Sequence, residues 1–294
     1  MSITLSSQSR SIAGAGTVRR TTGTEVLKRI GLYILLTLAA AILLFPLFFS
    51  LSLALQGPVI APNLLPNFDK LDWAVFGQVF AQEGNLGRWV LNSFVVSLIV
   101  TIGQIVTSAL AAYALAFFKF PGKTFFFFAF LATLLIPWEA TLVPNYLTIV
   151  GLHWNNGYLG LIAPFLASGF GIFLLRQYFL TIPTELYEAA VIDGCGRFRF
   201  LRSILLPLSR PAIGTLAVYA FLNTYNQYYW PLLVTDTPEW RTTQVGITAY
   251  KSTEVALYNL QMAATLIVML PTIALLIIGQ KQLVKGLTSG ALKG

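Results

Sequence analysis

The sequence predicts an all-α integral membrane protein with six transmembrane helices. Of its 294 residues, 56% are hydrophobic and 10% are charged, and the mean hydropathy is +0.73. Charged side chains are therefore too few to cover the surface of a soluble protein of this size. About 20 apolar residues cross a bilayer as a helix. Six segments meet or approach that length: about 30–55, 89–118, 125–149, 159–180, 212–235 and 259–280.

The chain begins with a polar, basic stretch before the first apolar segment. Residues 1–29 are rich in Ser, Thr, Gly and Arg, which predicts a flexible cytoplasmic tail. A cleaved signal peptide is disfavoured, because the apolar run from Ile30 to about Leu55 is longer than a signal-peptide core and lacks a clear small-residue cleavage site. The expected organisation is this tail followed by one six-span membrane domain, residues 30–294.

The distribution of basic residues predicts the orientation. If the N-terminus lies inside, fifteen of the nineteen lysines and arginines face the cytoplasm, and only Lys70, Arg88, Arg241 and Lys251 fall outside. Cytoplasmic loops of membrane proteins carry such an excess of Lys and Arg. Both termini and the loop 181–211 are therefore expected in the cytoplasm. The net charge of +8 needs no nucleic-acid partner.

The external loop after the first span contains a short helical pattern. In the stretch DKLDWAVFGQVFAQ, residues 69–82, Trp73, Phe76 and Phe80 recur at helical spacing. This pattern is typical of a short helix that lies on the outer membrane surface. A small packed subdomain is the alternative.

The chain lacks the residues that most enzymatic or metal sites require. Its single cysteine, Cys195, and single histidine, His153, exclude an internal disulfide, a zinc cluster and a histidine-based triad. The stretch FPGKT at 120–124 resembles the end of a phosphate-binding loop, but Phe117 stands where that loop needs glycine. We therefore expect no metal or cofactor in this chain, and any ATP must be bound by another subunit.

The loop 181–211 holds the densest charge of the chain between two apolar runs. Pro183 is expected to open a short helix, with Glu185 and Glu188 near its positive end. Ala189 and Ala190 follow as small residues that allow close approach to a groove on a partner. The pattern predicts a docking element; an interfacial hairpin that merely covers the helix ends is the alternative.

A turn and a second basic segment complete this loop. Asp193, Gly194, Cys195 and Gly196 are expected to end the first helix, because glycine tolerates the dihedral angles found at helix ends. The apolar residues expected on one side of the second segment are Phe198, Leu201, Ile204 and Leu205. Pro207 and Pro211 then close the loop before the next span.

The loop resembles a known family. The stretch EAAVIDGCGRFRFLRSILLP, residues 188–207, is similar to the signature loop of permease subunits of binding-protein-dependent ABC importers. The matching positions are Glu188, Ala189, Ala190, Gly194, Ile204, Leu206 and Pro207. Cys195 departs from the family pattern, which usually has alanine there, and a small apolar cysteine should change little.

The resemblance implies a fold, a site and a set of partners. The fold is the type I ABC importer permease fold in the bacterial inner membrane, and the loop helix docks on a cytoplasmic ATPase. The residues expected to make or shape that contact are Glu185, Glu188, Ala189, Ala190, Asp193, Gly194 and Cys195. The expected partners are a second, different permease, a pair of ATPase subunits that bind ATP and Mg, and an extracytoplasmic solute-binding protein.

Other stretches narrow the resemblance to one group. LNSFVVSLIV (91–100), AAYALAFFKFPGK (111–123) and KGLTSGALKG (285–294) resemble the smaller permease of carbohydrate importers. NTYNQYYWPLLVTD (223–236) and EWRTTQVGI (239–247) are more similar to glycerol-3-phosphate permeases than to maltose permeases. The expected solute is glycerol 3-phosphate or a glycerophosphodiester. A neutral oligosaccharide such as maltose or trehalose is the alternative.

Polar residues within the spans are candidates for a solute pathway. Glu139 should lie about 21 Å along the third span at 1.5 Å per residue, and a carboxylate at such depth is costly and commonly functional. Helix packing or gating is its alternative role. Asn223, Asn226, Gln227 and Tyr229 offer amides and a phenol for solute hydroxyls. The amides equally suit hydrogen bonds between helices.

Two other classes of protein fit less well. A secondary transporter would need more membrane-embedded acids and basic residues for ion coupling, and no inverted repeat is visible in the sequence. A membrane enzyme would need a cluster of His, Asp, Glu or Cys near the interface. The sequence therefore favours a non-catalytic permease subunit.

Overall fold

The computed structural model describes residues 23–56, 71–83, 85–250 and 258–288, and all regular elements in these ranges are helices. The first helix, α1 (Gly23–Leu55), begins inside the stretch expected to be a tail, whose residues 1–22 lie outside the described part. Residues up to Phe48 form one compact unit and residues from Phe49 form a second. The side chains of α1 from Leu27 to Phe45 are exposed, as in a helix surrounded by lipid.

Three described helices are long and apolar enough to cross a membrane: Leu27–Leu55 within α1, α3 (Leu86–Phe117), and Tyr258–Gln282 within α14 (Tyr258–Thr288). Three further candidates are bent pairs. The first joins α4 (Lys123–Thr133) to α5 (Trp138–Gly151) at 94°, the second joins Tyr158–Phe165 to α7 (Gly169–Phe179) at 44°, and the third joins Arg197–Leu208 to α11 (Arg210–Tyr225) at 81°. The described residues thus hold three spans, or up to six if each pair counts as one. The predicted number of six and the orientation stay predictions.

The spans expected over 125–149, 159–180 and 212–235 are each interrupted in the structure. In the first, the Thr133 hydroxyl donates a hydrogen bond to the Phe130 carbonyl at 2.7 Å where α4 ends. Pro137 then takes an extended conformation (ψ 132°) before α5 begins, as proline favours at a helix start. In the third, α11 ends at Tyr225 and a separate helix, α12 (Tyr229–Val234), follows.

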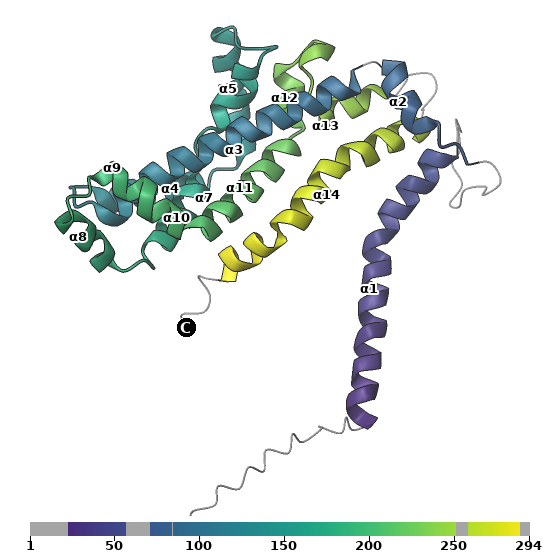
Figure 1. The fold of residues 1–294 in the computed structure, drawn as a ribbon. Helices are drawn as coiled ribbons and strands as arrows, with labels where there is room; N and C mark the ends of the chain where they lie inside the picture. The colour runs from purple at the N-terminus through teal and green to yellow at the C-terminus, as the bar shows by residue number, and fades with distance from the viewer. Residues whose placement is uncertain (1–22, 57–70, 84, 251–257, 289–294) are drawn as a thin grey trace, which may run out of the picture. The chain divides into compact units, whose positions relative to one another are not determined.

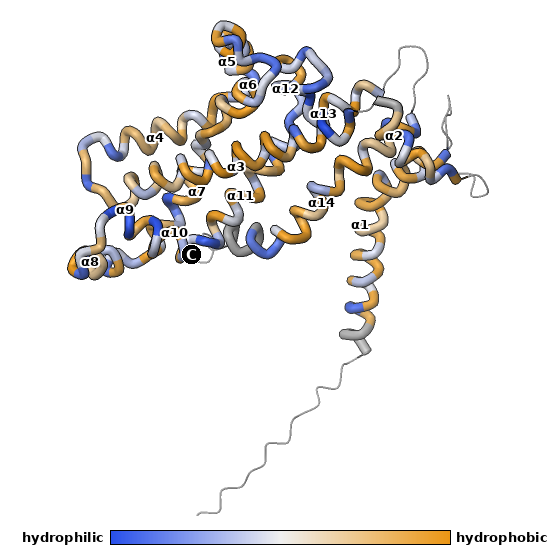
Figure 2. Tube along the Cα trace, turned by 45° about the horizontal axis from the view of Figure 1, so that its top comes forward, coloured by the Kyte–Doolittle hydropathy of each residue, from blue (hydrophilic) through white to orange (hydrophobic). Residues whose placement is uncertain are grey.

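Short helices connect these longer ones. They are α2 (Val75–Glu83), α6 (Tyr158–Ile162), α8 (Thr184–Ile192), α9 (Arg197–Phe200), α10 (Leu206–Leu208) and α13 (Thr243–Gly246). The π-helical turn η3 (Leu201–Leu205) lies between α9 and α10. Helices α3, α11 and α14 lie side by side, with α8 to α10 near one end of this bundle and α2, α12 and α13 near the other (Figure 1). The long helices are coloured mostly apolar and the connections are more polar (Figure 2).

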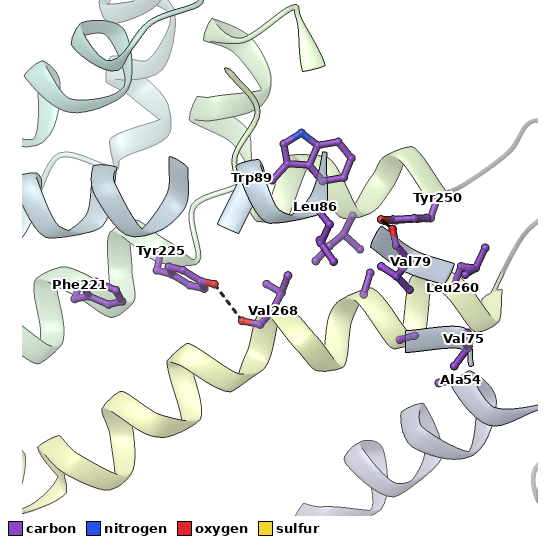
Figure 3. Packing of buried hydrophobic residues seen from close by; sticks show 13 residues of the cluster. Ala54, Val75, Val79, Leu86, Trp89, Phe221, Tyr225, Tyr250, Leu260 and Val268 are labelled. Atoms are coloured by element: carbon purple, nitrogen blue, oxygen red, sulfur yellow. Dashed lines mark hydrogen bonds between the residues drawn. The ribbon is translucent and has the colours of Figure 1, made fainter. Parts of the chain in front are cut away.

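The end of the bundle near α2 has a packed core (Figure 3). It includes Trp89 of α3, Tyr225 of α11 and Tyr250, and the Tyr225 hydroxyl donates to the Val268 carbonyl at 3.2 Å. Helix α2 contributes Val75 and Val79, which are fully buried, while Trp73 and Phe80 remain exposed. The predicted short helix is therefore present. Its position on a membrane surface stays a prediction.

The break between α6 and α7 is held by side chains of α3. Gln104 Nε2 donates to the Phe165 carbonyl at 2.9 Å. Thr107 Oγ1 lies 2.9 Å from both the Leu166 carbonyl and the Gly103 carbonyl of its own helix, and it can donate to either. Ser168 Oγ accepts from the Gly171 amide at 3.1 Å and caps α7. Because lipid supplies no hydrogen bonds, a broken helix at membrane depth needs such partners.

Replacing Thr107 with valine should destabilise this break. Valine keeps the shape but cannot donate to the Leu166 carbonyl, and interhelical hydrogen bonds in membranes contribute about 0.6 to 2 kcal/mol. We expect the Thr107→Val protein to unfold in detergent at a Tm lower by about 2 °C or more.

Thr148→Val is the matched control, because the Thr148 hydroxyl donates only to the Pro144 carbonyl of its own helix, at 2.9 Å. Equal Tm values for the two variants would contradict a role of α3 in holding the break.

Candidate functional site

Helix α8 carries the residues expected to form the docking element. It begins after Pro183, whose ψ of 133° is extended. Glu185, Glu188 and Ala189 are exposed, whereas Ala190 is 7% exposed and packs into the core. Of the two alanines expected to make or shape the contact, only Ala189 is therefore open to a partner in this structure, and the role of Ala190 stays a prediction. Ala190 shares one side of α8 with Tyr187, three residues before it, and both pack against the same apolar cluster.

The turn after α8 has the hydrogen bonds of a Schellman motif. Gly194 has a φ of +74°, its amide donates to the Val191 carbonyl at 3.0 Å, and the Cys195 amide donates to the Ala190 carbonyl at 2.8 Å. A positive φ at this position is the reason for glycine. Asp193 is the exposed residue before it, and the half-buried Cys195 joins Ala190 in one apolar cluster. Glycine therefore ends the helix at the predicted place.

An aromatic cluster holds α8 against the end of α3; its members are Tyr113, Phe117, Phe118, Tyr187 and Phe200. The ring of Tyr187, in α8, lies 5.5 Å from that of Phe117 and 5.0 Å from that of Phe200. The Tyr113 hydroxyl donates to the Arg197 carbonyl at 3.1 Å. Because aromatic pairs at these separations add to the energy of burial, α8 is joined to α3 as a packed unit.

The second segment of the loop departs from the predicted pattern at one position. Leu201 and Leu205 are buried and Ile204 is half-buried, as expected, but Phe198 is 69% exposed. Phe200 takes the buried place instead, because the aromatic cluster receives its ring. The π-helical turn η3 widens the backbone here, which shifts side chains from regular helical spacing.

The docking element exposes apolar side chains among charges of both signs. Ile192 is 85% exposed, and Leu186 and Val191 are about half exposed. The spacing of Glu185, Glu188 and Ile192 places them on one side of α8. Large exposed apolar residues among charged ones mark a contact surface for a protein or for the membrane.

The predicted pathway residues of the fifth span meet at one cavity. Asn223, Asn226, Gln227 and Tyr229 line a space of about 460 Å³. The other lining residues are Trp138, Phe165, Tyr228 and Trp230. Asn223 lies in α11, whereas Asn226 and Gln227 lie in the break after its end at Tyr225. All three nevertheless line the same space.

The lining offers amides and aromatic rings and carries no charge. Asn226 is partly engaged, since its Nδ2 donates to the Leu222 carbonyl at 2.8 Å and its Oδ1 accepts from Gln244 at 3.4 Å. Glu139, in the first turn of α5, is exposed and does not line this cavity. The depth predicted for Glu139 was counted along one continuous helix, and it does not apply because α4 and α5 meet at 94°. A pathway role for Glu139 stays a prediction.

Sequence reasoning missed two kinds of lining residue. Trp138 lines the cavity, although a tryptophan near the end of a span is more typical of an anchor at the membrane interface. Nothing in the sequence marks Phe165 as a lining residue, because its place at the cavity depends on the helix break that follows it. Tyr228, by contrast, belongs to the polar and aromatic group already visible in the sequence.

Replacing Gly194 with alanine should destabilise the docking element. No atom lies within 4 Å of a Cβ at this position, so the cost comes from the positive φ. A side chain in the left-handed region costs about 1 to 2 kcal/mol. We expect the Gly194→Ala variant to show faster amide hydrogen exchange in α8.

Gly196→Ala is the matched control, since Gly196 has a φ of −65° and is equally open. If the Gly196 variant loosened α8 as much as the Gly194 variant, the dihedral explanation would be wrong.

Comparison with known proteins assigns the family. Residues 11–289 match the family described as the binding-protein-dependent transport system inner membrane component. The chain is 38% identical over 268 residues to the sn-glycerol-3-phosphate transport system permease protein UgpE of Brucella abortus, covering 87% of this chain and 94% of the relative. It is 39% identical over 270 residues to the protein of that name from Agrobacterium fabrum, with coverage of 88% and 95%.

A solved structure supports the fold. A chain of a bacterial ABC transporter involved in the import of the acidic polysaccharide alginate aligns with a TM-score of 0.76 at 20% identity, covering 88% of this chain and 98% of that chain. The predicted type I importer permease fold is thereby confirmed. The protein belongs to the family of inner membrane components of binding-protein-dependent transport systems, and it is a non-catalytic, multi-pass permease subunit of the inner membrane.

Proposed function

We propose that this chain is the permease subunit of an ABC importer that brings sn-glycerol 3-phosphate into the cytoplasm by alternating access. The names of relatives that are 38% and 39% identical support this solute. The residues of the α11–α12 break, which line the cavity, lie in the stretch that resembles glycerol-3-phosphate permeases. Maltose or another neutral oligosaccharide is the alternative solute.

Membership in the family implies a solute-binding protein and an ATPase as partners. We propose in addition that the chain pairs with a second, different permease and docks on a pair of ATPase subunits. ATP and Mg are bound and used there. This chain supplies part of the route for the solute and links the ATPases mechanically to the membrane helices.

The packing of α8 against the aromatic cluster is the observation that supports the proposal most directly. Tyr187 of α8 and Phe117 of α3 are in ring contact, so a displacement of α8 is passed to the long helix α3. Tyr187 also contacts the ring of Phe200, from which the chain continues through η3 and α10 into α11. Near the far end of α11, Asn223 lines the cavity. Closure of the ATPases would therefore reach the membrane helices by two routes, through the ring contact with α3 and along the chain into α11.

The docking proposal predicts that Ile192→Asp prevents assembly with the ATPase. The Ile192 side chain is 85% exposed, so this change should leave the fold of the chain intact. An unpaired charge in a protein contact costs about 2 to 5 kcal/mol, which weakens binding about 30-fold or more. Copurification of the ATPase with the tagged permease measures the effect.

Leu152→Asp provides the control, because Leu152 is 48% exposed in the loop after α5, away from the docking element. This variant should retain the ATPase. If the Ile192→Asp variant also retained the ATPase, α8 would not be part of the contact with the ATPase.

The solute proposal predicts which molecule stimulates the assembled transporter. In proteoliposomes with the cognate binding protein, glycerol 3-phosphate should raise the rate of ATP hydrolysis and accumulate inside, whereas maltose should do neither. Stimulation by maltose alone would select the alternative solute. Accumulation driven by an ion gradient without nucleotide would contradict the importer mechanism itself.

A further inference from the structure

A second cavity lies at the end of the bundle that carries the docking element. It has a volume of about 280 Å³ and is lined by Arg210, Pro211, Lys281 and Gln282. Arg210 is the first residue of α11, and Lys281 and Gln282 belong to α14. Two cations from two different helices thus face one small space.

Close packing of α11 and α14 keeps the two cations together. Thr215 Oγ1 donates to the Gln282 carbonyl at 2.8 Å, and a Cβ on Gly214 would lie 2.9 Å from Gln282 Cγ. The helices therefore meet directly beside the cavity. The arrangement of its walls is set by this contact and not by flexible side chains alone.

The electrostatics of the cavity call for an anion. None of the lining residues is acidic, and within the described ranges no carboxylate forms an ion pair with Arg210 or Lys281. Arg210 also stands at the positive end of α11, where a cation is disfavoured. Arg210 and Lys281 are both exposed, so water screens part of their mutual repulsion, and a bound anion would reduce it further.

We propose that this cavity binds a phosphate group. Guanidinium and ammonium groups are the usual protein ligands of phosphate, since Arg donates a planar pair of hydrogen bonds and Lys a compact charge. The Gln282 amide adds a further donor. The group comes either from an anionic phospholipid of the membrane or from a free phosphate ion, and the site does not depend on which solute the transporter carries.

The test compares the Arg210→Gln, Lys281→Gln double variant with the wild type in the assembled transporter. In one arm, native mass spectrometry counts phosphatidylglycerol molecules retained after delipidation, with phosphatidylcholine as the neutral comparison. In the other arm, equilibrium dialysis in phosphatidylcholine nanodiscs measures binding of radioactive inorganic phosphate. Loss of two charged hydrogen-bond donors should weaken binding about tenfold or more in the arm that matches the source.

Lys119→Gln is the control, since Lys119 is exposed in the turn after α3 and does not line the cavity. A second variant, Arg210→Lys with Lys281→Arg, keeps both charges and should retain binding even if the neutral variant assembles poorly. Reduced phosphatidylglycerol retention in the neutral variant alone identifies a lipid, and reduced phosphate binding alone identifies the free ion. If the neutral variant, the control and the wild type bind equally in both arms, the proposal is wrong.

Discussion

The packing of α8 against the end of α3 is the contact on which the rest of the structure depends. Tyr187, Phe117 and Phe200 meet ring to ring, and the Tyr113 hydroxyl fixes the backbone of the next segment through the Arg197 carbonyl. A short helix of nine residues has little stability of its own. Its shape and its place both come from this cluster, so α8 can pass a displacement on without first unfolding.

Breaks in the membrane helices impose the second constraint. A helix in lipid satisfies its own backbone, but each break leaves carbonyl and amide groups that need partners. Gln104 and Thr107 of α3 supply them at the break before α7. At the break between α11 and α12, the Asn226 side chain bonds the Leu222 carbonyl. The polar residues that hold the breaks therefore also shape the space around them.

The sequence was enough to predict the class of fold and the helix, turn and helix of the loop 181–211. The long apolar runs and the helix end at Gly194 both follow from local chemistry. Phe198 was placed on the wrong side, because the aromatic cluster takes the ring of Phe200 instead, and that cluster is formed by residues distant in the sequence. The same holds for Phe165, since hydropathy counts a bent pair of helices as one continuous run.

The uncharged cavity limits how the proposed solute can be held. Amides and aromatic rings suit the hydroxyl groups and the carbon chain of glycerol 3-phosphate, but they leave the charge of its phosphate unpaired. Taking an unpaired charge out of water is costly, so a site of high affinity would need a cation beside this lining. None of the eight lining residues carries one, so any cation for the phosphate would have to come from outside this lining, for example from the proposed second permease or from the solute-binding protein. A permease that moves its solute onward is served by such a weak, partial site, because tight binding in the route would slow release.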